Sequence, residues 1–234
     1  FFHQLAAEMN REWFHANKHV YEEQWVAPMT ALLDEVRGKL ASAYKGVPLA
    51  EPKVFRIHRD VRFGKDKRPY KENAGCQFRH ALGKNAHAPG FYVHFAVDEV
   101  FFGGGLWMPE PDALSKIRHA IAGDAKAWKK IVTDKAFAKS FGGVHGDALA
   151  RPPKGFDADH PCIDDIKRKS FFAMHKSSVK TAQSPALLDE VEAAEARGVL
   201  ALDLRHEERL GEGARVALRG IEAAGHVRGD VGLH

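Results

Sequence analysis

Hydrophobic residues recur every three or four positions through the first 45 residues of the chain. The clearest series is Met29, Leu32, Leu33, Val36, Leu40 and Tyr44. This spacing brings side chains to one face of an α-helix, so the segment is predicted to be helical and to cover a core with this apolar stripe. Pro28 lacks the backbone N–H that a helix interior uses, and we expect the helix to kink or restart there.

An alternating pattern replaces the helical one at residue 53. In KVFRIHRDVRF the apolar side chains are Phe55, Ile57, Val61 and Phe63, interrupted by Arg59, and the polar ones between them are Arg56, His58, Asp60 and Arg62. Alternation with a period of two places the two sets on opposite faces of a β-strand. The following segment, GKDKRPYKEN, is predicted to be a polar loop because Pro69 does not fit a central strand.

Two further stretches predict that the sheet continues to residue 107. AGCQFRHAL indicates a second strand. GFYVHFAVDEVFFGGGLW predicts a hairpin with its turn near residues 98–99 and with Tyr92 and His94 on its polar face. The three glycines at 103–105 indicate a bulge or a close approach of another backbone.

Helical spacing returns at residue 109. PEPDALSKIRHAIAG and AKAWKKIVTDKAFAKSF predict two helices separated at Gly123 and Asp124. A long loop and a further strand in IKRKSFFAMHKSSVK precede a last helix in SPALLDEVEAAEA. We therefore predict an α+β fold, in which a mostly antiparallel sheet at about residues 53–107 is packed on one face by N- and C-terminal helices.

The pattern also divides the chain in two. Residues 1–190 are predicted to form a single α+β domain, and residues 191–234 an atypical tail rich in Ala, Arg and Gly that is helical or disordered. From Ala186 to His234 only nine residue types occur, and Lys, Ser, Asn, Gln and the aromatic residues are missing. Such a tail is either a natural Ala/Arg-rich helix or an altered reading frame of a GC-rich gene, and sequencing the gene distinguishes the two.

Composition adds few constraints. The chain has 234 residues, of which 44% are hydrophobic, and no apolar run approaches the roughly 18 residues of a membrane-spanning helix. The first residues lack the features of a signal peptide, so we expect a cytoplasmic protein without a membrane partner. Because the sequence begins at Phe1 and not at a methionine, we expect its native start to be missing. Cys76 and Cys162 are expected to be free thiols. The sequence has no CxxC pair, so a structural zinc site is not expected.

Positive charge is concentrated in one part of the sequence. The net charge of the whole chain is +4. Between Lys53 and Lys84, ten Lys or Arg residues stand against three acids, an excess of seven, so the remainder of the chain is slightly acidic. A focused basic segment favours an anionic partner.

These residue types predict an anion site. Arginines at alternate positions of a strand can hold a phosphate or a carboxylate through bidentate hydrogen bonds. The anion-binding candidates are Arg56, Arg59, Arg62, Lys67, Lys71, Arg79 and Tyr92. Asp60 and His94 are the candidate catalytic residues, with Asp60 orienting an arginine or transferring a proton. The predicted partner is a small phosphorylated or carboxylated molecule, and the sequence does not decide whether the protein is an enzyme.

Other interpretations use the same residues. An antiparallel sheet with one solvated face carries such charges without binding a ligand. A nucleic-acid-binding module would use the basic strand and the lysines of the loop at 65–71 to neutralise phosphates. The segment FDADHPCIDD holds carboxylates and an imidazole but no recognised ligand spacing, so no metal site is predicted. No motif indicates a cofactor, a reaction or an oligomeric state.

Several motifs together resemble a known family. REWFHANKHVYEE, APMTALL, PKVFRIHRDVRFGKDKRPYK, GFYVHF, GGGLWMPEPDALSKIR and RPPKGFDADHP follow one another in this chain. In this order they resemble the DUF2461 family of uncharacterised bacterial and fungal proteins, over about residues 1–190. The resemblance implies a shared fold and no activity. The family tends to have Tyr where His58 stands, and its usual ending, a helix with aromatic and proline residues, differs from the tail of this chain.

Overall fold

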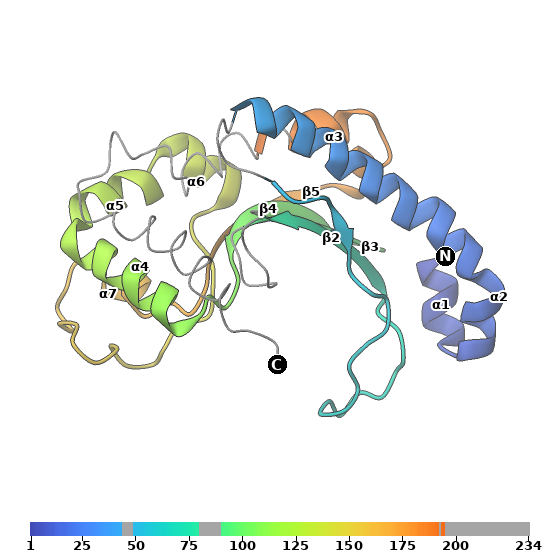
Figure 1. Cartoon of the computed structure of the whole chain (residues 1–234), viewed down its shortest axis with the longest axis horizontal. Coiled ribbons are helices and arrows are strands. Elements are labelled where there is room, and N and C mark those ends of the chain that lie inside the picture. The colour runs from blue at the N-terminus through green and yellow to red at the C-terminus, as the bar shows by residue number, and fades with distance from the viewer. Residues whose placement is uncertain (44–48, 80–89, 192, 195–234) are drawn as a thin grey trace, which may run out of the picture. The chain divides into compact units, whose positions relative to one another are not determined.

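The computed structural model describes residues 1–43, 49–79, 90–191 and 193–194. Helices flank one open antiparallel sheet (Figure 1), which confirms the predicted α+β class. Over these described residues the sheet has five strands in the order β1-β2-β3-β4-β5. The strands are β1 (Lys53–Val54), β2 (Asn73–Arg79), β3 (Gly90–Ala96), β4 (Val100–Leu106) and β5 (Phe171–Ser177). The further strand expected after the long loop is β5, which extends the sheet beyond residue 107.

The helices lie before, between and after the strands. Those that precede the sheet are α1 (Phe2–Glu8), α2 (Arg11–Tyr21), the π-helical turn η1 (Glu22–Val26) and α3 (Ala27–Ala43). Between β4 and β5 the chain forms α4 (Pro111–Gly123), α5 (Ala125–Val132), α6 (Lys135–Phe141) and α7 (Ile163–Ile166). After β5 come α8 (Val179–Ala182) and a helical segment at 186–191.

The described residues divide into two compact units. The first contains residues 1–43, 49–79, 91–102 and 175–191. The second contains residues 90, 103–174 and 193–194. The predicted tail at 195–234 lies outside the described residues, so its helical, disordered or frame-shifted nature stays a prediction.

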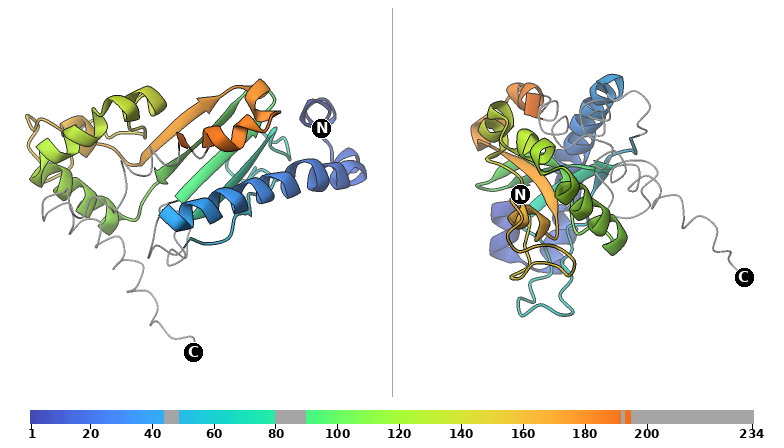
Figure 2. Two further views of the ribbon diagram at one scale, coloured as in Figure 1. Left: turned by 90° about the horizontal axis from the view of Figure 1, so that it is seen from above. Right: turned by 90° about the vertical axis from the view of Figure 1, so that its left-hand side faces the viewer.

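The core of the first unit lies between α3 and one face of the sheet. Met29, Leu33, Val36 and Leu40 are buried along α3, which confirms these members of the predicted stripe. Leu32 is half-buried, and Tyr44 lies outside the described residues. On β2 and β3, the rings of Phe78 and Phe91 stack with their centroids 4.6 Å apart. Figure 2 shows α3 running along the strands. The apolar residues spaced for a helix on α3 and those alternating along β2 and β3 thus form one apolar layer.

The helix that was predicted to kink or restart at Pro28 passes through a π-helical turn just before it, and α3 begins at Ala27. α2 runs into η1 and η1 into α3 without a break. Proline cannot donate the usual hydrogen bond to the preceding turn. A wider turn just before it is a known way to accommodate such a missing bond inside a helix. Pro28 therefore sets the position of the wide turn and does not end the helix.

The prediction of one strand over residues 53–63 was wrong. Only Lys53 and Val54 form regular strand there, paired with Gln77 and Cys76. Further along, Arg59 N–H donates to the Pro69 carbonyl over 2.9 Å. Pro69 has no N–H to donate in return, so regular pairing cannot continue past this point.

The predicted hairpin of β3 and β4 is confirmed. Ala96 N–H donates to the Glu99 carbonyl over 2.8 Å, which closes the turn at residues 97–99. Phe91 and Val93 are buried, and Tyr92 and His94 lie on the opposite face because they alternate with them. The strand thereby positions two polar side chains away from the core.

The second unit confirms the two predicted helical segments, with one additional break. Asp124 accepts a hydrogen bond from Ala127 N–H and begins α5, as predicted. Asp134 accepts one from Phe137 N–H and begins α6, so the segment predicted as one helix is two. A short side-chain acceptor at each start satisfies N–H groups that have no partner within the helix.

Glu190 connects the C-terminal helical segment to β5 within the first unit. The Ser177 hydroxyl donates to its Oε2 over 2.6 Å, and His175 Nε2 lies 2.9 Å from its Oε1. Burial raises the pKa of Glu190, but the hydrogen bonds from Ser177 and His175 outweigh it and the net effect lowers the pKa. The ionised carboxylate is therefore stabilised in the folded chain.

We expect this contribution to stability to be lost in acid. Since the pKa is lower in the folded chain than in the unfolded one, the carboxylate stabilises the fold above the ordinary glutamate pKa. The effect is lost as the pH falls through the folded value. Glu190→Gln should lower the free energy of unfolding by about 1 kcal/mol at pH 7. In urea titrations this difference from the wild type should shrink as the pH falls below the ordinary glutamate pKa of about 4.3; a difference independent of pH would contradict the assignment.

Candidate functional site

An irregular two-stranded ribbon leads from the sheet to the basic loop. Val54 faces Cys76, whereas His58 faces Tyr70. Three residues lie between Val54 and His58 on one side of the ribbon, whereas five lie between Tyr70 and Cys76 on the other. Residues 71–75 therefore contain a bulge. Bulges redirect side chains out of the regular alternation. Lys71 comes just before the extra residues, donates its N–H to the Ile57 carbonyl over 2.8 Å and lines a pocket.

The pocket is open, has a volume of about 640 Å³ and lies within the first unit. Its lining residues are Arg59, Asp60, Arg68, Lys71, Glu72, Asn73, Tyr92 and His94. Five of the residues predicted from the sequence meet here: Arg59, Asp60, Lys71, Tyr92 and His94. Residues from the ribbon and from β3, far apart in the sequence, thus form one polar concavity.

Lys71 is the basic residue in this pocket that lacks an acidic partner. Its side chain is half-buried, and its ammonium lies 5.8 Å from the centre of the Phe55 ring. Among the described residues, no carboxylate forms an ion pair with it. Burial and, secondarily, the nearby Arg56 lower the pKa of Lys71. Both causes disfavour the charged form of Lys71. An anion beside the ammonium would favour the charged form and so raise the pKa again.

Tyr92 and His94 form a neutral hydrogen-bonded pair on β3. The Tyr92 hydroxyl lies 3.0 Å from His94 Nδ1. Burial, with a smaller effect of Cys76, raises the pKa of Tyr92 to about 12. Burial also lowers the pKa of His94, against an opposing effect of Glu99. At pH 7 both groups are therefore neutral, and the hydrogen bond between them can have either the hydroxyl or the Nδ1–H as its donor.

Neighbouring residues fix the positions of this pair. The imidazole of His94 stacks on the ring of Phe101, with centroids 4.4 Å apart and an interplanar angle of 8°. A methyl group at Gly75 would lie 2.6 Å from the Tyr92 hydroxyl oxygen. Glycine at this position of β2 therefore leaves the space that the hydroxyl occupies.

Asp60 is held by an arginine two residues along the chain. Arg62 Nε donates to its Oδ1 over 2.9 Å and Arg62 Nη2 to its Oδ2 over 2.7 Å. The side-chain and backbone hydrogen bonds from Arg62 keep the pKa of Asp60 well below its usual range. A carboxylate held so firmly in its ionised form is a weak proton acceptor. Asp60 pairs with Arg62 in this geometry, and both roles considered for it stay predictions.

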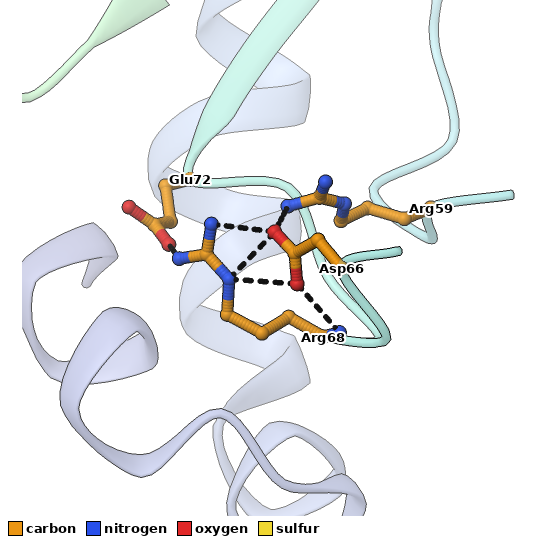
Figure 3. A network of polar contacts seen from close by, with 4 residues as sticks. All are labelled: Arg59, Asp66, Arg68 and Glu72. Carbon is orange, nitrogen blue, oxygen red and sulfur yellow. Dashed lines mark hydrogen bonds and ion pairs between the residues drawn. The ribbon is translucent and has the colours of Figure 1, made fainter. Parts of the chain in front are cut away.

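Asp66 is the centre of a second group of ion pairs (Figure 3). Its Oδ2 accepts from Arg59 Nη1 over 2.8 Å and from Arg68 Nη2 over 2.7 Å. Its Oδ1 accepts from the backbone N–H of Arg68 over 3.0 Å. Glu72 binds the remaining nitrogen, Nη1, of the Arg68 guanidinium. Two arginines that line the pocket are therefore held by carboxylates of their own loop.

Four of the predicted residues do not line the pocket. Arg56 is exposed on the ribbon, and Arg79 lies at the opposite end of β2 from Asn73. Arg62 has 74% of its side chain exposed and pairs with Asp60. Lys67 Nζ donates to the Val61 carbonyl over 2.8 Å. Of the arginines expected to converge, only Arg59 lines this pocket, because the segment is not a regular strand; anion binding by the four residues stays a prediction.

Sequence reasoning missed Arg68, Glu72 and Asn73 as pocket residues. A signal for Arg68 was present, since Asp66-Lys67-Arg68 repeats the arrangement of Asp60-Val61-Arg62. In both, the aspartate accepts from the backbone N–H two residues later and pairs with the guanidinium of the same residue. An Asp-X-Arg sequence in a polar loop thus indicates a local turn closed by an ion pair.

The acidic segment FDADHPCIDD has structural roles in the second unit. Asp165 accepts from the Trp128 indole N–H over 2.7 Å and pairs with Arg168. Asp157 accepts from the backbone N–H of Asp159. Across the residues that the structure describes, no group of three or more His, Cys, Asp or Glu side chains is arranged to hold a metal ion. Cys76 and Cys162 are both buried free thiols, as expected.

Comparison with known proteins places the chain in a family. A family model described as a conserved hypothetical protein, DUF2461, matches residues 1–198. The chain belongs to the DUF2461 family. The match includes every residue of the pocket and confirms the resemblance carried by the sequence motifs. No curated protein matches the chain. Within the described residues, no helix is long and apolar enough to span a membrane.

Proposed function

We propose that the protein binds a small anionic molecule, a phosphate ester or a carboxylate, in the pocket of the first unit. The observation that carries this proposal is the half-buried ammonium of Lys71, which lacks an acidic partner among the described residues and has a lowered pKa. Charge-assisted hydrogen bonds to such a cation are stronger than those between neutral groups. An anion at this position would relieve the electrostatic cost of burying the charge.

Tyr92 and His94 complete the proposed site as neutral groups. Their mutual hydrogen bond uses one donor and one acceptor. In either imidazole tautomer the pair therefore keeps one donor and one acceptor for a ligand, shared between the hydroxyl and Nε2. A partly protonated phosphate ester or a ligand hydroxyl needs both kinds of partner. A neutral imidazole of this kind is also suited to proton transfer if the ligand undergoes a reaction.

Titration calorimetry tests this proposal. Inorganic phosphate, a small phosphate ester and a small carboxylate are titrated into the full chain at low and moderate salt. We expect saturable binding at one site for at least one of them, with only a modest loss of affinity at moderate salt. Absence of binding to every member of such a panel, in calorimetry and in thermal-shift measurements, would refute the proposal.

One observation favours a second candidate, nucleic-acid binding by the basic loop. Phe63 is 91% exposed, and the Arg62 guanidinium lies 5.5 Å from the centre of its ring. An exposed aromatic ring among cations can stack on a base while the cations contact phosphates. Binding of an oligonucleotide should then weaken steeply with salt, unlike the binding of a small anion.

Phe63→Ala distinguishes this candidate. If a base stacks on the ring, the variant should bind a fluorescent single-stranded oligonucleotide about fivefold or more weakly than the wild type, since such stacking contributes about 1–3 kcal/mol. Small-anion binding should be unchanged, because Phe63 does not line the pocket. Equal oligonucleotide affinities of variant and wild type would exclude stacking at this position.

A further inference from the structure

We propose that the ligand of this pocket carries two anionic groups, and that its second group takes the place of the Asp66 carboxylate between Arg59 and Arg68. This inference rests on the proposed function, in which Lys71 binds the first group. It makes Asp66 an internal competitor of the ligand and defines the substrate class as bis-anionic.

The donors around Asp66 already form an anion site. The carboxylate accepts from Arg59 Nη1 over 2.8 Å, from Arg68 Nη2 over 2.7 Å and from Arg68 Nε over 2.9 Å. The backbone N–H of Arg68 adds a fourth donor at 3.0 Å. Two guanidinium groups and a backbone N–H around one pair of oxygens are the arrangement that proteins use for phosphate and carboxylate groups. Asp66 therefore shows where an anionic group of a ligand would sit.

This anion site is adjacent to the place proposed for the first group. Arg59 and Arg68 line the same pocket as Lys71, whereas Asp66 does not line it. A molecule bound to Lys71 thus has two further cations within the same concavity. Within the described part of the chain, their carboxylate partners are Asp66 and Glu72 of the loop (Figure 3).

Exchange of Asp66 for a ligand group is physically accessible. The Asp66 side chain is 37% exposed and that of Arg68 51% exposed. Ion pairs at such exposure contribute little to stability, because solvent screens them. A phosphate group carries more negative charge than a carboxylate and has more acceptor oxygens. The ligand therefore has to overcome only a weak internal pair.

Glu72 prepares Arg68 for the exchange. It binds Arg68 Nη1, whereas Asp66 accepts hydrogen bonds from Arg68 Nε and Nη2. When Asp66 moves away, this pair still restrains the guanidinium at the pocket. Glu72 is therefore a positioning residue, and a bound anion meets an arginine that is already oriented.

Matched ligands and matched variants test the inference. Propylphosphonate has one anionic group, and propane-1,3-bisphosphonate and pentane-1,5-bisphosphonate have two at different separations. Their dissociation constants are measured by calorimetry for the wild type, Asp66→Asn and Asp34→Asn. Asparagine at 66 retains an oxygen for the Arg68 backbone N–H, so the turn is preserved. Asp34 pairs with Arg37 on α3 and does not line the pocket, so its variant makes the same change of charge elsewhere in the unit.

Asp66→Asn should tighten the binding of at least one bisphosphonate by roughly threefold or more, because it removes the competing charge. Propylphosphonate affinity should change less than twofold, and Asp34→Asn should affect neither ligand class. An unchanged or weaker bisphosphonate affinity in Asp66→Asn, or an equal gain for propylphosphonate, would overturn the inference while the proposed function stands. Failure of the wild type to bind any of the three ligands would also overturn the inference, and the titrations with phosphate, a phosphate ester and a carboxylate would then decide separately whether the proposed function stands.

Discussion

Lys71→Met is expected to weaken the binding of inorganic phosphate or a phosphate ester by about tenfold or more. A hydrogen bond to a charged group contributes about 1.5–3 kcal/mol, and about 1.4 kcal/mol corresponds to a factor of ten in affinity. Methionine keeps an unbranched side chain against Phe55 and removes only the ammonium. Titration calorimetry on the variant and the wild type measures the difference.

Lys65→Met is the matched control for this prediction. Lys65 lies on the same loop and is exposed, and it does not line the pocket. Its replacement changes the net charge equally, so a specific site predicts little loss of affinity. If both variants lost affinity to the same extent, the loop would act only through its overall charge, and Lys71 would have no special role.

The stability of the Lys71 variant provides an independent check. The pKa of Lys71 is lowered in the folded chain, so below that pKa the folded state carries a charge that burial and Arg56 disfavour. Removing the charge should therefore leave the ligand-free protein as stable as the wild type, or more stable. A variant that lost both binding and stability would indicate that the ammonium has a structural role, such as an ion pair with a carboxylate.

The helical part of the fold could be predicted because its pattern depends on local spacing. Met29, Leu33, Val36 and Leu40 lie on one face of any α-helix, and they are buried as expected. The strand at residues 53–63 failed because pairing is not local. Alternation in sequence does not reveal that Pro69 lies opposite Arg59 and ends the hydrogen bonding.

The site could be predicted only in part for the same reason. Tyr92 and His94 were placed correctly on one face of β3, because strand alternation holds there. Lys71 was chosen for its charge alone, and its position in the pocket depends on the pairing of the ribbon, in which its N–H donates to the Ile57 carbonyl. Which arginine would be neutralised depended on turns closed by Asp60 and Asp66, which period-two reasoning does not detect.

Gly103→Ala should be among the most destabilising single substitutions in the second unit. A methyl group at this position of β4 would lie 1.9 Å from the carbonyl oxygen of Ala173 on β5. The obstacle is backbone, so the two strands would have to separate where the sheet is hydrogen-bonded. We expect a loss of about 3 kcal/mol in the free energy of unfolding, at the upper end of what overpacking costs. For a chain of this size that corresponds to a melting temperature lower by about 6–12 °C.

Gly38→Ala is the matched control, because the same substitution is expected to have the opposite effect there. Gly38 lies in α3, and a methyl group would have no neighbour within 4 Å. Alanine in an exposed helix stabilises a protein by about 0.5–1 kcal/mol relative to glycine. Opposite shifts in thermal melting would establish that close backbone approach, and not the loss of glycine as such, determines the effect. Similar melting temperatures for the two variants would mean that β4 and β5 do not approach each other at Gly103 as described, and the order of the sheet at that edge would have to be revised.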